Sequence, residues 1–421
     1  MIEKATPVER LRGWRPQLVR YAASLTILGA VPIVQFASFL LAGRMLSLEQ
    51  FGHLILFQAS AAILVEVAGG GMSEVLIRNV ARDRSSCRQS LLDFVVVGIP
   101  TGLLAVLVNA LVQVAIFGPS PLAALAALYG TFEICSQRVL ILWEQVALAH
   151  GHTKRADMVR LLPAVIRLAA LVLLLFAGGH TLTAIAAVYV ACGVISAIAC
   201  SVVGVMTYGA PAGRMDPTVF SAGVPFALIQ LLRAVQNNFD RIVLKAVLSS
   251  ADVAIYATAM KFVQVGFLPA ATMLRMWYPR IFAAGHDPAG KLRALSVRLL
   301  VPVLAAAGMA AAVLIASARL LPLAMGPDFD ASVPILQFAA PTLIVTAIGY
   351  LGGDVLTGAD RPYLRVAFLV IAISVQVAAM VLLSPALGTA GAVVAFYISA
   401  TLFAALCWGA VSKLRPAPAA A

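Results

Sequence analysis

The chain has 421 residues and a net charge of +12, with 62% hydrophobic but only 11% charged residues. Ordinary soluble domains contain about 25% charged residues, so this composition excludes a soluble globular protein and indicates an all-α integral membrane protein. The positive charge does not indicate a nucleic-acid partner, because the basic residues lie in short segments between apolar runs. The five cysteines show no metal-ligand spacing, so we expect no metal and no cofactor.

Apolar runs of about 20 residues, the length that crosses a bilayer as a helix, follow one another along the whole chain. The first run is too long for the apolar region of a signal peptide, so we expect it to be an uncleaved span. We predict about twelve transmembrane spans, at 20–43, 52–77, 90–117, 122–149, 158–178, 182–208, 218–248, 253–274, 294–316, 333–356, 363–384 and 388–411.

The Lys and Arg residues predict the orientation, because cytoplasmic segments of membrane proteins retain these residues. With a cytoplasmic N-terminus, 22 of the 30 Lys and Arg residues lie in inside segments, 3 lie in outside segments and 5 lie within spans. We therefore predict that both termini are cytoplasmic and that the segment 317–332 is on the outer side.

The two halves of the chain echo each other at a nearly constant offset, which is typical of duplicated transporters. The clearest echo is between 46–52 and 248–254, each in the outer turn after the first span of a half. Six spans per half make the repeat parallel, with a cavity between the halves. The predicted parts are a cytoplasmic basic segment, an N-terminal six-helix bundle, a cytoplasmic linker, a C-terminal six-helix bundle and a cytoplasmic tail, at 1–19, 20–208, 209–217, 218–411 and 412–421.

The predicted second span carries Glu66, Gly70 and Glu74 on one helical face, and glycines at 69–71 weaken the helix at its middle. One interpretation is a hinge at Gly70 beside a proton-accepting Glu66. The alternative is close helix packing at the glycines, with Glu66 in an ion pair with an arginine of another span.

Other charges lie within the predicted spans, and each costs about 2.5 to 3.5 kcal/mol at the helix centre unless it faces protein or water. Glu133 and Arg167 have similar depths on consecutive spans, which predicts a structural pair. Arg138 has no predicted partner, so it is a candidate for facing the cavity and binding an anion. Asp354 lies near the inner end of the tenth span and is expected to be exposed at the membrane interface.

The predicted seventh span contains a cationic ladder, because Arg233, Asn237, Arg241 and Lys245 recur every fourth residue and share one face. Lys261 on the eighth span has a depth close to that of Arg241. Guanidinium groups bind phosphate through paired hydrogen bonds, and an ammonium group adds a point charge. The ladder therefore predicts a binding track for a pyrophosphate headgroup.

A structural role for these charges is the alternative. Arg241 would then pair with Asp240 or Glu66, and Lys245 would only extend to the outer membrane surface. Adjacent residues do not face each other on a helix, so a pair between Asp240 and Arg241 is not expected. As acids within spans, Glu66 and Asp240 are, together with Gly70, candidates for coupling or gating.

Several segments occur in an order and spacing that belong to a known family: Phe39–Ser47 with Gln50–Gly52, Asp240–Leu244 with Ala254–Tyr256, Gly326–Phe329, and Gly388–Ala392. On these residues the chain resembles the polysaccharide-transporter and O-antigen flippase branch of the multidrug/oligosaccharidyl-lipid/polysaccharide exporter superfamily. Gly43 departs from the family, which usually has Ala there. The resemblance implies two six-helix bundles around a central cavity, as in MATE transporters. It also implies export of an undecaprenyl-pyrophosphate-linked oligosaccharide across the bacterial inner membrane by alternating access.

Three functions compete on these features. A flippase fits the cationic ladder, whereas a cation-coupled multidrug exporter would need a buried carboxylate in the first span, which has Gln35 and Ser38 but no acid. A membrane polymerase or ligase of sugar chains usually has a large outer loop, and 317–332 is short. We expect a flippase and no enzyme. Its partners would be the lipid-linked oligosaccharide and membrane lipids, with other polysaccharide-assembly membrane proteins left open.

Overall fold

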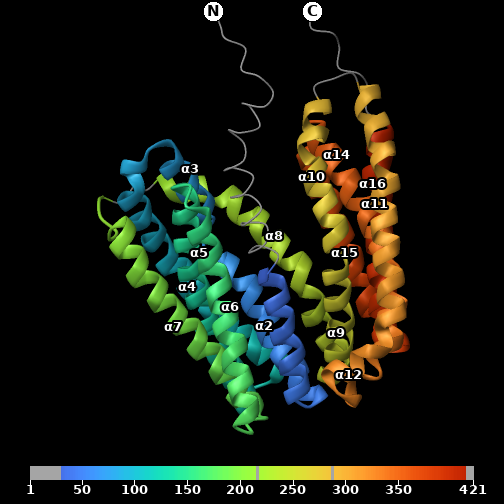
Figure 1. Cartoon of the computed structure of the whole chain (residues 1–421), viewed down its shortest axis with the longest axis horizontal. Helices are drawn as coiled ribbons and strands as arrows, with labels where there is room; N and C mark the ends of the chain where they lie inside the picture. The colour runs from blue at the N-terminus through green and yellow to red at the C-terminus, as the bar shows by residue number, and fades with distance from the viewer. Residues whose placement is uncertain (1–29, 215–217, 286–288, 414–421) are drawn as a thin grey trace, which may run out of the picture. The chain divides into compact units, whose positions relative to one another are not determined.

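The computed structural model describes residues 30–214, 218–285 and 289–413, and these residues form helices and turns without a strand (Figure 1). Among them, ten helices are long and apolar enough to cross a membrane. A further pair, α9 (Ser250–Gly266) and the Leu268–Tyr278 part of α10 (Leu268–Gly285), is long and apolar enough only when taken together, with a bend of 42° between the two helices. The prediction of an all-α membrane protein with about twelve spans is confirmed.

The first predicted span is described only in part. The apolar helix Ala30–Met45 covers the second half of this span and ends slightly past its predicted end. Residues 20–29 lie outside the described part of the chain. The basic segment 1–19 and most of the tail 412–421 also lie outside it. The cytoplasmic location of both termini therefore stays a prediction.

The chain divides into two compact units. Unit 1 holds the chain up to Met45 and Phe57–Val235, and unit 2 holds Leu46–Leu56 and the chain from Gln236 onwards. The chain passes between units inside two helices, α2 (Leu48–Val67) and α8 (Thr218–Val247). The six-helix bundles at 20–208 and 218–411 were predicted from the sequence alone. Their boundary at the 209–217 linker therefore stays a proposal.

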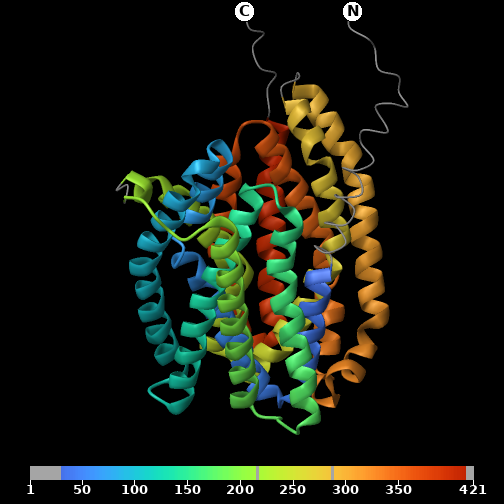
Figure 2. The ribbon, with the colours of Figure 1, turned by 60° about the vertical axis from the view of Figure 1, so that its left-hand side comes forward.

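Unit 1 is a bundle in which α5 (Pro121–Ala149) is central, because it packs against four other helices. These are α3 (Met72–Arg82), α4 (Cys87–Phe117), α6 (Thr153–Phe176) and α7 (Leu182–Tyr208), drawn from blue to green in Figures 1 and 2. Serine and threonine caps begin α5 and α7: Ser120 accepts from the Ala123 N–H, and Thr181 accepts from the Ala184 N–H.

Unit 2 places α16 (Thr389–Ser412) against α14 (Thr342–Gly358) and α15 (Pro362–Leu387). Its remaining helices are α9, α10, α11 (Ala289–Ser317), α12 (Leu321–Met325) and α13 (Ser332–Ala339). The turn at 248–254, which echoes 46–52 in the sequence, contains a capping box, in which Ser249 and Asp252 satisfy each other's backbone N–H at the start of α9.

The predicted second span is not one continuous helix. Helix α2 ends at Val67 and α3 begins at Met72, because Gly70 and Gly71 take φ values of 52° and 72°. Residues other than glycine rarely adopt this left-handed conformation. The glycine break (residues 68–71) is closed by backbone hydrogen bonds, such as that from the Met72 N–H to the Gly69 carbonyl at 2.9 Å.

Candidate functional site

The predicted cationic ladder lies on α8, which is continuous from Thr218 to Val247. Arg233 and Asn237 are exposed, whereas Arg241 and Lys245 are half-buried. The division between the units falls just after Val235, so Arg233 belongs to unit 1 and the other three residues to unit 2. The four residues therefore lie on one helix with the predicted spacing, but they belong to two different units of the protein.

Arg241 belongs to a cluster within unit 2 that we call the unit 2 cluster (Asp240, Arg241, Tyr256 and Lys261). The Tyr256 hydroxyl donates to Asp240 Oδ2 at 3.1 Å, which links α9 to α8. Asp240 Oδ1 accepts the backbone N–H of Arg241 at 2.9 Å. Lys261 is half-buried and lies within electrostatic range of Arg241, as the matching depths predicted. The structure therefore brings two of the predicted anion-binding residues together.

The contact between Asp240 and Arg241 corrects the sequence analysis, which did not expect these neighbours to meet. Arg241 Nε lies 4.0 Å from Asp240 Oδ1. Their Cβ atoms point in different directions, but the short aspartate side chain folds back onto its own helix to accept the next N–H. Arg241 Nη1 also donates to Asn238 Oδ1 at 3.0 Å, which brings the guanidinium back along α8.

A second set of charges, the unit 1 cluster (Glu66, Glu74, Arg138 and Arg233), surrounds the glycine break. Arg138 is only 8% exposed, and its guanidinium occupies the space that a side chain at Gly69 would fill. Its Nη2 donates to Ser73 Oγ at 3.2 Å, and the guanidinium lies over the Phe94 ring at 4.9 Å. The prediction that Arg138 has no partner is therefore wrong, because α3 and α4 supply partners for it.

The two acids of the unit 1 cluster are engaged with its basic and amide groups. Gln230 on α8 donates to Glu74 Oε1 at 2.6 Å. Glu66 is half-buried, and the charges acting on it come from Arg138, Glu74 and Arg233. Of the two interpretations of span two, the arginines around Glu66 favour the packing and ion-pair alternative, although no hydrogen bond between Glu66 and an arginine is described.

The glycine break also seats the first half of α8. A Cβ atom at Gly71 would overlap the carbonyl oxygen of Gly223, and one at Gly223 would overlap that of Gly70. Close backbone approach of this kind is what small residues permit between membrane helices. Helix packing at the glycines is therefore present. A hinge at Gly70 stays a proposal.

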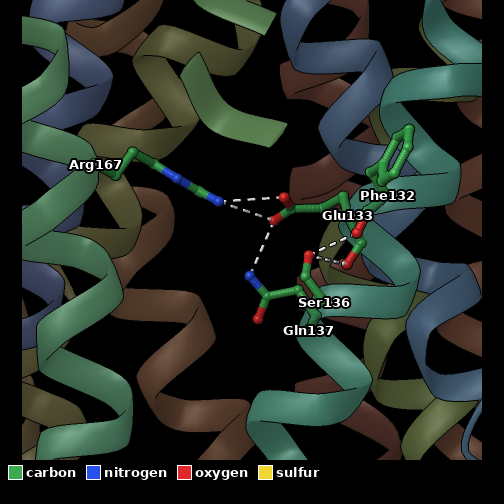
Figure 3. A network of polar contacts seen from close by, with 5 residues as sticks. All are labelled: Phe132, Glu133, Ser136, Gln137 and Arg167. Carbon is green, nitrogen blue, oxygen red and sulfur yellow. Dashed lines mark hydrogen bonds and ion pairs between the residues drawn. The ribbon is translucent and has the colours of Figure 1, made fainter. Parts of the chain in front are cut away.

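The predicted pair between Glu133 and Arg167 is confirmed. Arg167 Nη2 lies 3.2 Å from Glu133 Oε2, as Figure 3 shows. Gln137 donates to Glu133 Oε1 at 3.0 Å, and the guanidinium also lies over the Tyr189 ring at 4.3 Å. The pair therefore fastens α6 to α5 and α7 in the interior of unit 1.

Asp354 is buried and paired rather than exposed at the interface. It is 7% exposed, and Arg365 Nη1 on α15 lies 2.7 Å from its Oδ1. Arg365 lies on the first turn of α15, which begins at Pro362, and from there it reaches α14. A second missed pair, Glu144 with Arg160 at 3.0 Å, joins α5 to the first two turns of α6.

No group of His, Cys, Asp or Glu residues suited to a metal ion occurs among the described residues. Both clusters are built from charged and polar side chains. The unit 1 cluster combines two acids with two arginines, whereas the unit 2 cluster combines one acid with an arginine and a lysine. Of the two, the unit 2 cluster has the excess of positive charge that an anionic ligand requires.

Solved structures share this fold over most of their length. An inward-facing multidrug resistance MATE family transporter of the MOP superfamily has 15% identity and a TM-score of 0.73, covering 93% of this chain and 99% of that one. Lipid II flippase MurJ in an inward closed conformation has 12% identity and a TM-score of 0.74, covering 93% and 88%. A MOP superfamily transporter from Pyrococcus furiosus, described as having a binding pocket of reverse polarity, has 15% identity and a TM-score of 0.65, covering 98% and 100%.

These identities are low enough that the likeness shows the fold alone. No curated protein matches the sequence. The family model described as polysaccharide biosynthesis protein matches residues 18–284, which is more than half of the chain and includes both clusters. The chain therefore belongs to the polysaccharide biosynthesis protein family.

Proposed function

We propose that the protein is a flippase that moves an undecaprenyl-pyrophosphate-linked oligosaccharide, such as a repeat unit of O-antigen or exopolysaccharide, across the bacterial inner membrane. The observation that carries this proposal is the unit 2 cluster, where Arg241 and Lys261 lie within electrostatic range of each other. Like charges repel, so two half-buried cations are brought together at a cost that an anionic ligand would remove. Family membership and the fold shared with MurJ support the same conclusion.

The headgroup would be bound by the cations that the sequence predicts, with unequal roles. Arg241 and Lys261 form the centre of this site, and Lys245 extends it along α8 within unit 2, whereas Arg233 lies in unit 1 beside Glu66. Arg138 is already held by Ser73 and lies near two acids, so its part in anion binding is the weakest element of the prediction.

Membrane potential can drive the proposed transport. A pyrophosphate headgroup with about two negative charges gains roughly 4 to 5 kcal/mol per 100 mV when both charges leave the negative cytoplasm. Ion coupling is therefore not required by the energetics. If coupling exists, Glu66 is the better of the two candidate acids, because Asp240 is fixed by Tyr256 and a backbone N–H. Gly70 is the candidate hinge.

A cation-coupled multidrug exporter is the second candidate, since the MATE structures with the same fold include a multidrug resistance transporter. The first predicted span has no carboxylate, and a cationic cluster would repel cationic drugs. An enzyme of sugar-chain assembly is disfavoured, because the segment between α11 and α13 on the predicted outer side is short and folded into brief helices.

Reconstitution tests the proposal directly. The purified protein is placed in liposomes with a fluorescent undecaprenyl-pyrophosphate oligosaccharide, and a membrane-impermeant quencher reports the fraction in the outer leaflet. We expect rapid loss of the protected fraction, faster when a membrane potential drives the anion towards the quencher. If a Na⁺ or H⁺ gradient drives transport of a cationic dye and the lipid-linked oligosaccharide does not move, the flippase proposal is wrong and the protein is a drug exporter.

Cysteine labelling tests the predicted orientation. Asp328 is exposed in the segment 317–332, so Asp328→Cys in a cysteine-free background should label from the periplasm of intact cells. Ser332 is a poor position for this experiment, because its side chain is fully buried. Labelling of Asp328→Cys only after the inner membrane is permeabilised would contradict both cytoplasmic termini and the twelve-span topology.

A further inference from the structure

Asp240 is one of the most firmly held acids of the described chain. It is 7% exposed, and Tyr256, which donates to it, is fully buried. Both carboxylate oxygens are used, one by the Tyr256 hydroxyl on α9 and the other by the Arg241 N–H on α8. A carboxylate that is bonded to two helices has little freedom to move. It can therefore hold a neighbouring side chain in place.

Arg241 is the neighbour that Asp240 holds. Its Nε lies 4.0 Å from Asp240 Oδ1, and its Nη1 donates to Asn238 Oδ1 at 3.0 Å. The guanidinium is planar, so the hydrogen bond at Nη1 restrains the whole group, while its Nε makes no hydrogen bond within the described part of the chain and faces Asp240 at ion-pair distance. The side chain is 13% exposed, so the rest of the guanidinium has limited access to a ligand.

Asp240, Arg241 and Tyr256 belong to two of the segments on which the family resemblance rests. Asp240 and Arg241 begin the segment Asp240–Leu244, and Tyr256 ends the segment Ala254–Tyr256. The structure joins these segments through one hydrogen bond, between Tyr256 and Asp240. The sequence pattern therefore describes one three-residue arrangement built across two helices.

We propose that Asp240 and Tyr256 are positioning residues for Arg241 in anion recognition, an inference that rests on the proposed function. Tyr256 anchors Asp240, and Asp240 orients the Arg241 guanidinium so that it can bind a phosphate group through paired hydrogen bonds.

A purely structural link between α8 and α9 is the competing explanation, and a double-mutant cycle separates the two. The measurement is the Kd of the purified full-length protein for farnesyl pyrophosphate, with farnesyl phosphate as the comparison ligand. The cycle combines Asp240→Asn, which keeps the shape and removes the charge, with Arg241→Lys, which keeps the charge and removes the planar fork.

Positioning predicts strong coupling in this cycle. Asp240→Asn should weaken binding of farnesyl pyrophosphate about 10-fold in the otherwise unchanged protein and less than about 2-fold in the Arg241→Lys background, within the range measured for residues in contact. Tyr256→Phe should reproduce the smaller part of this loss. Both variants should reduce the preference for farnesyl pyrophosphate over farnesyl phosphate, because a loosened guanidinium forms fewer paired bonds.

Two matched controls come from the same unit. Asp354→Asn alters a buried carboxylate with its own arginine partner, and Tyr397→Phe removes a hydroxyl that donates to the Phe338 carbonyl at 2.8 Å. Each should leave the Kd unchanged in both backgrounds, and Asp354→Asn should lower the Tm instead. Tyr256→Phe is the variant to rely on if Asp240→Asn does not fold.

The outcomes are distinct. If Asp240→Asn causes the same loss of affinity whether residue 241 is Arg or Lys, the positioning role is overturned. The proposed function is left intact by that result. Unchanged affinity and ligand preference in Tyr256→Phe would do the same. If the unsubstituted protein binds neither farnesyl ligand, the proposed function fails, and the positioning role fails with it.

Discussion

The unit 1 cluster and the unit 2 cluster differ in their balance of charge. In the unit 1 cluster, two acids face two arginines at a break in a membrane helix, and each group has partners within the protein. In the unit 2 cluster, one acid holds one arginine on continuous helices, with a lysine close by. The first arrangement is balanced in charge, and the second is not. Of the two, the second is better suited to an anionic ligand.

The difference follows from the backbone at each place. At the glycine break the C-terminus of α2 and the N-terminus of α3 lie close together, and these helix ends carry partial charges of opposite sign. Arg138 near the end of α2 and Glu74 in the first turn of α3 offset these partial charges. Helices α8 and α9 offer no such groups at Arg241 and Lys261. We therefore expect changes in unit 1 to affect folding and changes in unit 2 to affect transport.

Arg138→Ala should give the largest effect and should act on stability. Removing one partner of a buried charge cluster typically costs about 3 to 5 kcal/mol, so protein abundance and Tm should fall sharply. A second substitution, Glu66→Gln, should recover part of the loss, because it removes the acid left without its arginine. Normal abundance of Arg138→Ala with loss of export would instead place Arg138 in the anion site, as the sequence predicts.

Gly71→Ala should be the next largest effect. Its φ of 72° strains an L-residue by about 1 to 2 kcal/mol, and its new methyl group would overlap the Gly223 carbonyl of α8. The combined loss should be about 2 to 4 kcal/mol of unfolding free energy once overpacking is included. Gly98→Ala is the control, because its methyl group would meet nothing within 4 Å. Equal stability of the two variants would contradict the seating of α8 on the glycine break.

Arg241→Ala and Lys261→Ala should act on transport with little change in abundance. Loss of a hydrogen bond between charged groups costs about 1.5 to 3 kcal/mol, so export should fall about 10- to 100-fold. Arg241→Lys should restore part of the activity, because charge returns without the planar fork. Export is measured in cells per molecule of folded protein, and full activity of both alanine variants would remove the unit 2 cluster from the mechanism.

Asp354→Asn should give the smallest effect, about 1 to 2 kcal/mol of stability, because the amide oxygen can still accept from Arg365. Its rate of export per folded molecule should match that of the unsubstituted protein. Thermal unfolding and a transport assay on the same preparation check both parts. A reduced export rate at unchanged Tm would show that the α14–α15 pair has a role in transport.

The fold could be predicted from the sequence because apolar length and positive charge are properties of single segments. The twelve predicted spans needed no knowledge of packing, and Glu133 with Arg167 could be paired because both lie at mid-depth on consecutive helices. The break at Gly70 and Gly71 was visible as weakness in the helix, but its geometry depends on Gly223 of α8, which is distant in sequence.

The partners of charged side chains were predicted less well, for an identifiable reason. Charges were matched to other charges, whereas Arg138 bonds Ser73 and lies over Phe94, and Asp240 bonds Tyr256. Hydroxyl and aromatic groups are common in every span, so the sequence does not indicate which of them is near. Asp354 was expected at the membrane interface from its depth in its own span, whereas its burial depends on its partner Arg365 on the next helix, α15.

The central claim is that unit 2 binds the substrate anion, and one comparison tests it most directly. Arg241→Ala and Arg138→Ala are reconstituted in equal folded amounts, and their rates of moving the undecaprenyl-pyrophosphate oligosaccharide are measured against the unsubstituted protein. We predict a rate reduced about 10- to 100-fold for Arg241→Ala and, in the fraction that folds, a rate close to normal for Arg138→Ala. The reverse order of the two rates would contradict the account.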